Sequence, residues 1–357
     1  MSKDLFSLPR LELAKLPTPL ERVERLGHAL EDIDLWFKRD DLTGFGLGGN
    51  KVRSLEYLAA DAMKINSNIL VTGGSPGSNH VRTTMAVAAH LGLKGVAVLS
   101  GTMPSETQGN LLLNKLLQAN LVFTGDPERI YLDSYIENEV ERLRTLGEKP
   151  YMIKRGGVSS LGCVGYVTAA VEICSQLKDL DITPDLLLCA TGCGVTQAGL
   201  LVGFKLMGLN CQLYGITVSR SRDECIAHIR QLAKETEEIL GLDSRVTSDD
   251  ILVFDEYIGE GYSVPTLEGI EAIRLVAKTE GIFLDPIYTG KAMAGLTDLV
   301  KKRHIGPDKT VIFLHTGGSP SIFSNSSVIS DSNNTTDSIF EKDTISNVNL
   351  ESLQNIS

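Results

Sequence analysis

The segment from Lys38 to Lys51 constrains this chain more than any other part of its sequence. It reads Lys-Arg-Asp-Asp-Leu-Thr-Gly-Phe-Gly-Leu-Gly-Gly-Asn-Lys, and a helix-like pattern begins at Val52. The closely spaced glycines let the backbone turn sharply and approach a ligand. A lysine beside such a backbone is placed to meet a flat, anionic partner. The segment therefore indicates a binding loop, either for a nucleotide or for a cofactor that the lysine bonds covalently.

Nucleotide binding fits this loop poorly, although residues 44–49 match the pattern G-x-G-x-x-G. A dinucleotide site also needs a strand directly before the loop and an acidic residue about twenty positions after it. Asp40 and Asp41 separate the candidate strand at 35–38 from the glycines. Residues 69–72 contain no acid, and the Gly-Lys-Ser/Thr ending of a Walker loop is absent. The covalent partner is therefore favoured.

Length and composition exclude several classes of protein. The 357 residues are enough for about two domains of common size, and 42% apolar residues can form a sizeable core. No run approaches the roughly 18 apolar residues of a membrane span, and residues 1–10 do not resemble a secretory signal. A net charge of −11 argues against binding nucleic acid, which relies on excess Lys and Arg. We expect a cytoplasmic protein without membrane or nucleic-acid partners.

The six cysteines are expected to be free thiols. Disulfides are rare in a long chain without a secretory signal. The spacing of Cys189 and Cys193 is not that of a zinc site, and the histidines show no spacing that suggests metal binding. We therefore predict neither disulfides nor a metal.

Strand and helix patterns alternate along most of the chain. Ser78 or Asn79 can cap a helix that follows a buried strand and a glycine turn. Such strand–helix–strand units require parallel sheets, so the predicted class is α/β with helices on both sheet faces. Strands are expected at 68–72, 95–100, 185–190, 212–218 and 310–315, and helices at 129–146, 196–207 and 266–279.

Two further segments at predicted helix starts are candidate anion sites. Thr191-Gly-Cys-Gly-Val-Thr196 follows a strand, and helix-start amides favour a phosphate there, with the hydroxyls of both threonines as further donors. The alternative is a plain strand–helix turn, which would need only one glycine. The amides of Ser78-Asn-His80 could hold a carboxylate, and the alternative for Ser78 is a simple N-cap.

Taken together, five motifs make the chain resemble the D-cysteine desulfhydrase and 1-aminocyclopropane-1-carboxylate deaminase family. The motifs occur in order across roughly residues 8–323. They are Gly48-Gly-Asn-Lys51, Ser78-Asn-His80, Thr191-Gly-Cys-Gly194, Asp285-Pro-Ile-Tyr-Thr-Gly-Lys291 and His315-Thr-Gly-Gly318. The resemblance implies a pyridoxal-phosphate enzyme of fold type II, like the tryptophan synthase β-subunit, which binds a small amino acid and forms a homodimer.

The resemblance also implies two α/β domains. Residues 1–54 and 165–323 would form the larger, cofactor-binding domain, and residues 55–164 a smaller inserted one. The composition changes near Ser324, after which Ser, Asn, Asp and Thr dominate without sustained periodicity. We therefore predict a disordered tail over residues 324–357.

The resemblance implies a role for each motif. Lys51 looks like the Schiff-base lysine, Asn79 like the partner of the cofactor's 3-oxygen, and Thr316 like the residue facing the pyridine nitrogen. The implied catalytic residues are Lys51, Ser78 and Tyr288. The implied cofactor-binding residues are Lys51, Asn50, Asn79, Thr191, Gly192, Cys193, Gly194, Val195, Thr196 and Thr316. The implied substrate-binding residues are Ser78, Asn79, His80, Tyr262, Tyr288 and Thr289.

Two positions favour the desulfhydrase branch of that family. Thr289 and Thr316 stand at motif positions where the ring-opening deaminases of the family have Glu and Leu. We therefore expect β-elimination of D-cysteine to pyruvate, sulfide and ammonia, with elimination favoured over transamination by the hydroxyl of Thr316. Gly77 and Cys193 depart from the family pattern and bear on the substrate. The alternatives are a lyase or deaminase for another small amino acid (L-cysteate, a β-substituted D-alanine or 1-aminocyclopropane-1-carboxylate), or a non-catalytic protein that binds pyridoxal phosphate or a dinucleotide.

Overall fold

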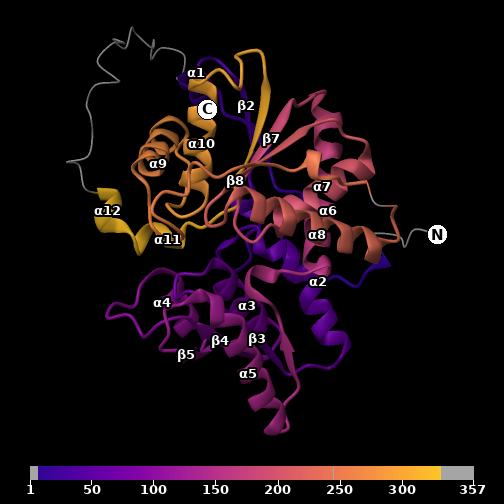
Figure 1. Cartoon of the computed structure of the whole chain (residues 1–357), viewed down its shortest axis with the longest axis vertical. Coiled ribbons are helices and arrows are strands. Elements are labelled where there is room, and N and C mark those ends of the chain that lie inside the picture. The colour runs from indigo at the N-terminus through magenta and orange to yellow at the C-terminus, as the bar shows by residue number, and fades with distance from the viewer. Residues whose placement is uncertain (1–6, 244, 331–357) are drawn as a thin grey trace, which may run out of the picture.

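Figure 1 shows the computed structural model of the chain, which describes residues 7–243 and 245–330. Two sheets with flanking helices divide it into an upper and a lower half in this view. The predicted α/β class is confirmed, because both sheets are parallel except for one strand pair.

The larger sheet has six strands in the order β1-β2-β10-β7-β8-β9. Only β1 and β2 pair in antiparallel fashion. The sheet therefore brings strands from both ends of the described chain beside strands from its middle. The bounds are Leu20–Arg22 (β1), Asp34–Lys38 (β2), Leu186–Thr191 (β7), Gln212–Thr217 (β8), Leu252–Phe254 (β9) and Thr310–Leu314 (β10).

Helices cover both faces of this sheet, as the continuous apolar run of β7 requires. Leu187 and Cys189 of β7 belong to the core cluster formed with α6, α7 and α8, whereas Leu186 and Leu188 belong to the cluster formed with α1, α9 and α10. Successive side chains on a strand point to opposite faces, so one strand serves both cores. The helix bounds are Glu24–Ala29 (α1), Ser160–Leu180 (α6), Val195–Met207 (α7), Arg222–Leu240 (α8), Leu267–Glu280 (α9) and Thr289–Lys301 (α10).

The smaller sheet has four parallel strands in the order β5-β4-β3-β6. Helices α2, α3 and α4 pack over one face, and α5 packs over the other. The bounds are Ile69–Gly74 (β3), Lys94–Leu99 (β4), Asn120–Phe123 (β5), Pro150–Met152 (β6), Lys51–Lys64 (α2), Asn79–His90 (α3), Gly109–Leu116 (α4) and Leu132–Thr145 (α5).

Helix α6 is the one helix of the described residues that is long and apolar enough to cross a membrane. More than half of its apolar window, 56%, is buried inside the protein, where α6 packs against α7, α2 and α8. The helix therefore has the burial of a core helix, which passes the same length and composition test.

A buried charged cluster fixes the start of α2 against β2 and α6. Arg53 donates to both carboxylate oxygens of Asp40 at 2.8 and 2.7 Å and to Glu172 at 2.9 Å. Tyr166 donates to Asp40 at 2.6 Å, and Lys38 bonds Glu172 at 2.5 Å. Burial alone would raise the pKa of Asp40, but the charge of Arg53 lowers it below its ordinary value. Removing one partner would leave an uncompensated buried charge, which is strongly destabilising. The bonds of the cluster therefore fix Arg53 in place, and with it the two residues directly before it in α2.

The predicted strands correspond to β3, β4, β7, β8 and β10, and the predicted helices to α5, α7 and α9. The candidate strand at 35–38 is part of β2. The helix expected to begin at Ser78 or Asn79 is α3, and the helix-like pattern that begins at Val52 lies in α2. The remaining strands and helices were not predicted. They include the three-residue strands β1, β6 and β9, which are too short to show a pattern.

The proposed domain boundaries stay a prediction. Of the tail expected to be disordered, residues 331–357 lie outside the described part. Two short helices were not predicted from the sequence. Helix α11, Pro320–Phe323, ends just before the predicted tail, and helix α12, Ser326–Ser330, lies within the first residues of the tail.

Candidate active site

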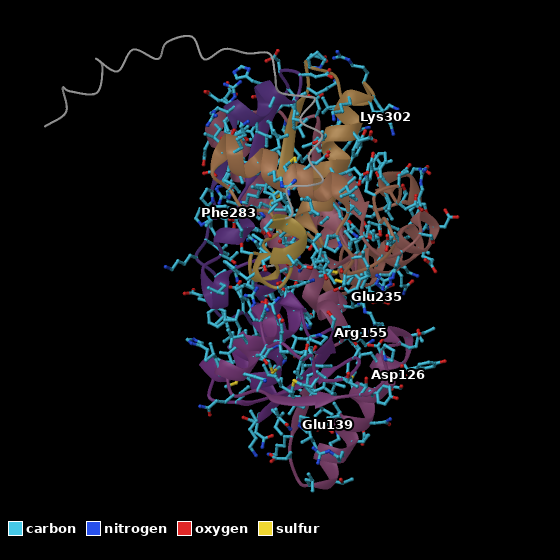
Figure 2. The ribbon with its side chains drawn as sticks, turned by 90° about the vertical axis from the view of Figure 1, so that its left-hand side faces the viewer. Asp126, Glu139, Arg155, Glu235, Phe283 and Lys302 are labelled. Carbon is cyan, nitrogen blue, oxygen red and sulfur yellow. The ribbon has the colours of Figure 1, made fainter. Side chains whose placement is uncertain are left out.

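A cavity of about 550 Å³ lies between the two sheets and collects most of the predicted site residues. It opens at the carboxyl ends of β3 and β7, where Gly73, Gly74, Ala190 and Thr191 line it. Ligand sites of parallel sheets occupy this edge, and the volume suits a small organic ligand. In the side view of Figure 2, Arg155, which also lines the cavity, lies at the level where the two halves meet.

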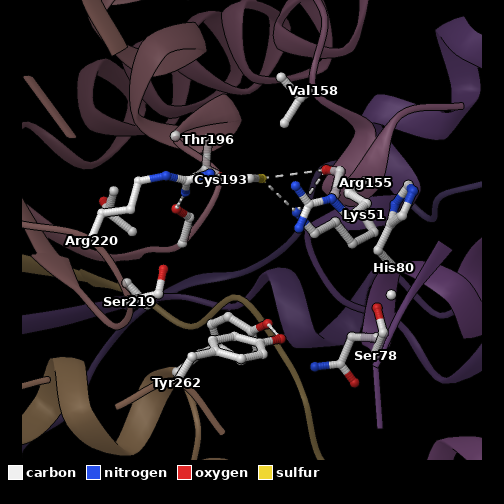
Figure 3. A pocket seen from close by; sticks show the side chains of 18 of the residues that line it. Lys51, Ser78, His80, Arg155, Val158, Cys193, Thr196, Ser219, Arg220 and Tyr262 are labelled. Carbon is white, nitrogen blue, oxygen red and sulfur yellow. Dashed lines mark hydrogen bonds between the residues drawn. The ribbon is translucent and has the colours of Figure 1, made fainter. Parts of the chain in front are cut away.

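Lys51 points into this cavity from the first turn of α2 (Figure 3). Its Nζ donates to the carbonyl oxygen of Gly156 at 3.1 Å and lies 3.5 Å from Sγ of Cys193. The glycines before it are required sterically. A Cβ on Gly48 would lie 2.1 Å from the carbonyl oxygen of Asp41, and Gly48 has a φ of +67°. The distances from Nζ to Gly156 and Cys193 place the amine of Lys51 beside the loop that begins at Thr191, not in bulk solvent.

That loop has the geometry of an anion cradle. Gly194, with a φ of +79°, caps the N-terminus of α7, whose first amide groups have no partner within the helix. The hydroxyl of Thr196 accepts from Nδ2 of Asn50 at 3.1 Å and so keeps its own proton for the cavity. The amides and this hydroxyl are the donors that the loop offers a phosphate.

Two expectations about this loop need correction or refinement. Thr191 was expected to add a second hydroxyl donor, which is wrong, because its hydroxyl donates to Oε1 of Gln197 at 2.7 Å. Thr191 still lines the cavity and, through this bond, ties the loop to α7. Val195 has its side chain buried in the core, so only its backbone can face a ligand.

Positive charges lie close to Cys193 of this loop. Burial opposes ionisation of the Cys193 thiol, but the charges of Lys51 and Arg220 and a backbone bond to Val195 lower its pKa below the ordinary value. Arg220 also donates to the carbonyl oxygen of Gly192 at 2.5 Å. Two cations thus lie beside the loop, which suits an anionic group there.

The motif Ser78-Asn79-His80 forms the opposite wall, at the start of α3. Ser78 is the N-cap of this helix, and its Oγ accepts from the amide of Val81 at 3.3 Å. The ring of His80 is buried and bonded to the hydroxyl of Thr72 at 3.0 Å. Burial, with the nearby charge of Lys51, lowers the pKa of His80 to about 3, so this ring stays neutral at working pH.

Two tyrosines and an arginine close the cavity on a third side. The hydroxyls of Tyr262 and Tyr288 lie 2.5 Å apart, and the guanidinium of Arg129 lies 3.7 Å from the ring centre of Tyr262. Burial, together with the neighbouring Tyr262, raises the pKa of Tyr288 well above its ordinary value. Tyr288 therefore offers the cavity a neutral hydroxyl and not a phenolate.

Thr289 does not line the cavity, although it was expected to contact the substrate. The residue is fully buried, and its hydroxyl accepts from the amide of Asp285 at 2.7 Å and donates to the carboxylate of Asp285 at 2.8 Å. That carboxylate also accepts from the amide of Tyr288 at 3.0 Å. The expected direct contact is therefore wrong, and Thr289 acts on the site through the turn that carries Tyr288.

Thr316 lines the cavity, and its carbonyl oxygen accepts from the amide of Asn50 at 3.0 Å. Sequence reasoning missed several other residues of the wall, which come from loops and from the first turns of helices α5 and α8, where no motif marks them. They are Ser75, Arg129, Asp133, Lys154, Arg155, Gly156, Val158, Ser219, Arg220, Glu224 and His228. Within the described residues, no cluster of His, Cys, Asp or Glu could hold a metal ion. The six cysteines are free, as predicted.

Comparison with known proteins matches the chain to one family along most of its length. The model of the family described as pyridoxal-phosphate dependent enzyme matches residues 11–317. The D-cysteine desulfhydrase of Salmonella paratyphi C (strain RKS4594) is 40% identical over 327 residues, which cover 89% of this chain and 97% of that protein. The D-cysteine desulfhydrase of Salmonella newport (strain SL254) has the same identity and coverage.

Solved structures agree with this match. An ACC deaminase homologue has a TM-score of 0.85 at 36% identity and covers 91% of this chain and 96% of its own. A fungal L-serine ammonia-lyase from Rhizomucor miehei has a TM-score of 0.65 at 18% identity, covers 89% of this chain and 98% of its own, and shows the shared fold alone. The resemblance inferred from the five motifs is confirmed.

Proposed function

The chain belongs to the family of pyridoxal-phosphate dependent enzymes, and we propose that within it the protein converts D-cysteine to pyruvate, sulfide and ammonia. The observation that carries this proposal is the 40% identity to D-cysteine desulfhydrase along 97% of that protein. The cavity supports it, because a lysine amine, an anion loop and a second helix start face the same space. A small amino acid and a phosphate-bearing cofactor need these three features together.

The residues of the cavity fit pyridoxal phosphate. The loop at Gly194 and the hydroxyl of Thr196 would hold the phosphate, and Lys51 would bond the aldehyde carbon. Asn79 and Thr316 would meet the ring oxygen and the ring nitrogen. When bound, the cofactor condenses with amino groups and accepts the electron pair released at the substrate's α-carbon.

The residues of the chain would then move protons and orient the substrate. The amine of Lys51, once displaced by the substrate's amino group, would remove the proton from the α-carbon. Ser78 and the amides at the start of α3 would hold the α-carboxylate, and Tyr288, which keeps its proton, could donate to the departing sulfur. The C–S bond then breaks with sulfide as the leaving group. Hydrolysis of the released product gives pyruvate and ammonia.

Incubation of the pure protein with candidate substrates tests the proposed activity. With pyridoxal phosphate present, we expect D-cysteine to yield equal amounts of pyruvate and sulfide. L-cysteine, L-cysteate, β-substituted D-alanines and the cyclopropane amino acid are measured in parallel. Pyruvate from one of these other β-substituted amino acids alone would indicate the related lyase instead. No product from any amino acid would indicate a binding protein without catalysis.

A second candidate is the ring-opening deaminase reaction, which the TM-score of 0.85 to an ACC deaminase homologue favours. We place it second, because Thr289 and Thr316 stand at motif positions where those deaminases have Glu and Leu. Ring opening of the cyclopropane amino acid is therefore expected to be absent or minor.

We further propose a cytoplasmic homodimer, as the family resemblance implies. Light scattering of the pure protein measures its mass and so tests the dimer.

Replacing Gly194 by alanine is expected to weaken cofactor binding by about tenfold or more, because the backbone could no longer close on the phosphate. A Cβ there would lie 3.0 Å from Ile229, in a backbone conformation with a φ of +79°. The strain should also lower the free energy of unfolding by about 1 kcal/mol. Titration with pyridoxal phosphate and thermal unfolding measure the two effects.

Gly208 at the other end of α7 provides the matched control. It has a φ of +68° and open space where a Cβ would be, and it does not line the cavity. Gly208→Ala should destabilise the protein similarly while leaving cofactor affinity unchanged. Equal cofactor affinity in both variants would place the phosphate elsewhere.

A further inference from the structure

The side-chain amide of Asn79 has one end inside the protein and the other at the cavity. Its Oδ1 accepts from Nδ2 of Asn110 at 2.8 Å. Asn110 lies in α4, is buried and does not line the cavity. Within the described part of the chain, no protein group bonds to Nδ2 of Asn79. The amide of Asn79 therefore presents hydrogen-bond donors to whatever occupies the cavity.

Two neighbours fix the amide of Asn110 in the orientation that this bond needs. Its Nδ2 also donates to the carbonyl oxygen of Gly77 at 2.8 Å, and its Oδ1 accepts from Nε of Arg82 at 3.3 Å. A carbonyl oxygen can only accept, and a guanidinium can only donate. Turning the amide over would place its NH₂ against Arg82 and its oxygen against two acceptors. The assignment of oxygen and nitrogen therefore follows from the chemistry of both neighbours.

Arg82 is the cation on which this chain of bonds depends. Its side chain is 2% exposed, and it forms no ion pair within the described residues. Besides Asn110, it bonds the carbonyl oxygens of Gly46 and Gly48, which belong to the loop that leads to Lys51. Burial lowers the pKa of Arg82 to about 10, so it remains charged at neutral pH. The same guanidinium thus connects the loop before the lysine with the amide of Asn110.

We propose that Asn110, oriented by Arg82, is a positioning residue that makes Asn79 a hydrogen-bond donor towards the cavity. Bonds run in one direction, from Arg82 to Asn110, from Asn110 to Asn79, and from Asn79 to the ligand. A site with this polarity selects an acceptor, and an oxyanion most strongly. The inference rests on the proposed function, in which the 3-oxygen of pyridoxal phosphate is that acceptor.

Asn110→Asp tests the polarity with almost no change of shape. A carboxylate at this position still accepts from Arg82 but cannot donate to Asn79, whose amide should then turn its oxygen to the cavity. The readouts are the affinity for pyridoxal phosphate and the pH midpoint of the visible absorbance of the bound cofactor. We expect the affinity to fall about tenfold, the size of one lost hydrogen bond to a charged group. The midpoint should rise by about one pH unit, because the 3-oxygen holds a neighbouring proton more tightly without its donor.

A pair of alanine variants on one helix separates positioning from packing. Asn110→Ala removes the orienting group and should shift both readouts in the same direction but by less. Asn114, one turn further along α4, is also a buried asparagine, and its side chain has no hydrogen-bond partner within the described residues. Asn114→Ala should leave both readouts as in the wild type. Circular dichroism of each variant confirms that it is folded.

The outcomes distinguish this inference from the proposed function. If the wild type binds pyridoxal phosphate and Asn110→Asp keeps its affinity and pH midpoint, the polarity inference is wrong while the proposed function stands. If the wild type binds no pyridoxal phosphate, both are overturned. A raised midpoint in Asn110→Asp, with Asn114→Ala unchanged, supports the inference, because a loss of packing alone would not move the protonation of the cofactor.

Discussion

Lys51→Ala is expected to abolish pyruvate release from D-cysteine, with a loss of at least about a thousandfold in kcat. The amine would serve twice, as the covalent partner of the cofactor and as the base at the substrate's α-carbon, so no neighbour can replace both roles. Its Nζ lies 3.1 Å from the carbonyl oxygen of Gly156 and 3.5 Å from Sγ of Cys193. Pyruvate and sulfide released under saturating D-cysteine measure the effect.

Two further variants show whether the amine itself is required. Lys51→Arg keeps a positive charge but loses the nucleophilic amine, because guanidinium stays protonated in proteins. It should be as inactive as the alanine variant. Lys64→Ala removes an exposed lysine at the other end of α2 and should behave like the wild type. Full activity in either Lys51 variant would remove the lysine from the mechanism.

Ser78→Ala is expected to lower kcat/KM for D-cysteine by about a hundredfold while the cofactor stays bound. Without the hydroxyl and its fixed helix start, the substrate carboxylate would lose its orientation, and misplacement by about 1 Å can have an effect of this size. The Oγ of Ser78 accepts from the amide of Val81 at 3.3 Å, so the change should also lower the free energy of unfolding by about 1 kcal/mol. Steady-state kinetics, cofactor absorbance and thermal unfolding measure the three quantities.

A second N-cap separates the catalytic from the structural role of Ser78. Thr266 caps α9, where its side chain accepts from the amide of Gly269 at 3.1 Å, and it does not line the cavity. Thr266→Ala should cause a similar loss of stability without a loss of turnover. If the Ser78 variant turned over D-cysteine as the wild type does, Ser78 would be an N-cap and nothing more.

The parts of the fold that sequence predicted are those with local signals. Residues 68–72 and 185–190 are buried apolar runs that end in glycine turns, and both became central strands, β3 and β7. Such a strand is recognisable because its own residues carry the pattern. The short edge strand β9, at Leu252–Phe254, carries no pattern, and its pairing with β8 is decided by distant residues.

The residues of the candidate site also fall into those with a local sequence signal and those without one. Gly194 and Ser78 were found because helix starts after strands have a local signature. Gly156 was missed, although it accepts a hydrogen bond from Lys51, because it lies 105 residues along the chain in a loop without a motif. Only folding brings these loops together, so the wall they form could not be predicted.

Side-chain partners explain the two expectations that failed. Thr191 stands in the right loop, but its hydroxyl donates to Gln197, and sequence alone does not say which acceptor a threonine will find. Thr289 belongs to the right motif, but its hydroxyl bonds Asp285 behind the cavity wall. A motif thus predicted the neighbourhood of both residues but not the direction in which each hydroxyl points.

Borohydride reduction of the pure protein with bound pyridoxal phosphate, followed by peptide mass mapping, tests the central claim most directly. Reduction makes the bond between the cofactor and a lysine permanent, so the modified residue can be identified. We expect one pyridoxyl-phosphate adduct per chain, on the peptide that contains Lys51. An adduct on a different lysine, or none on a protein that binds the cofactor and turns over D-cysteine, would contradict the account.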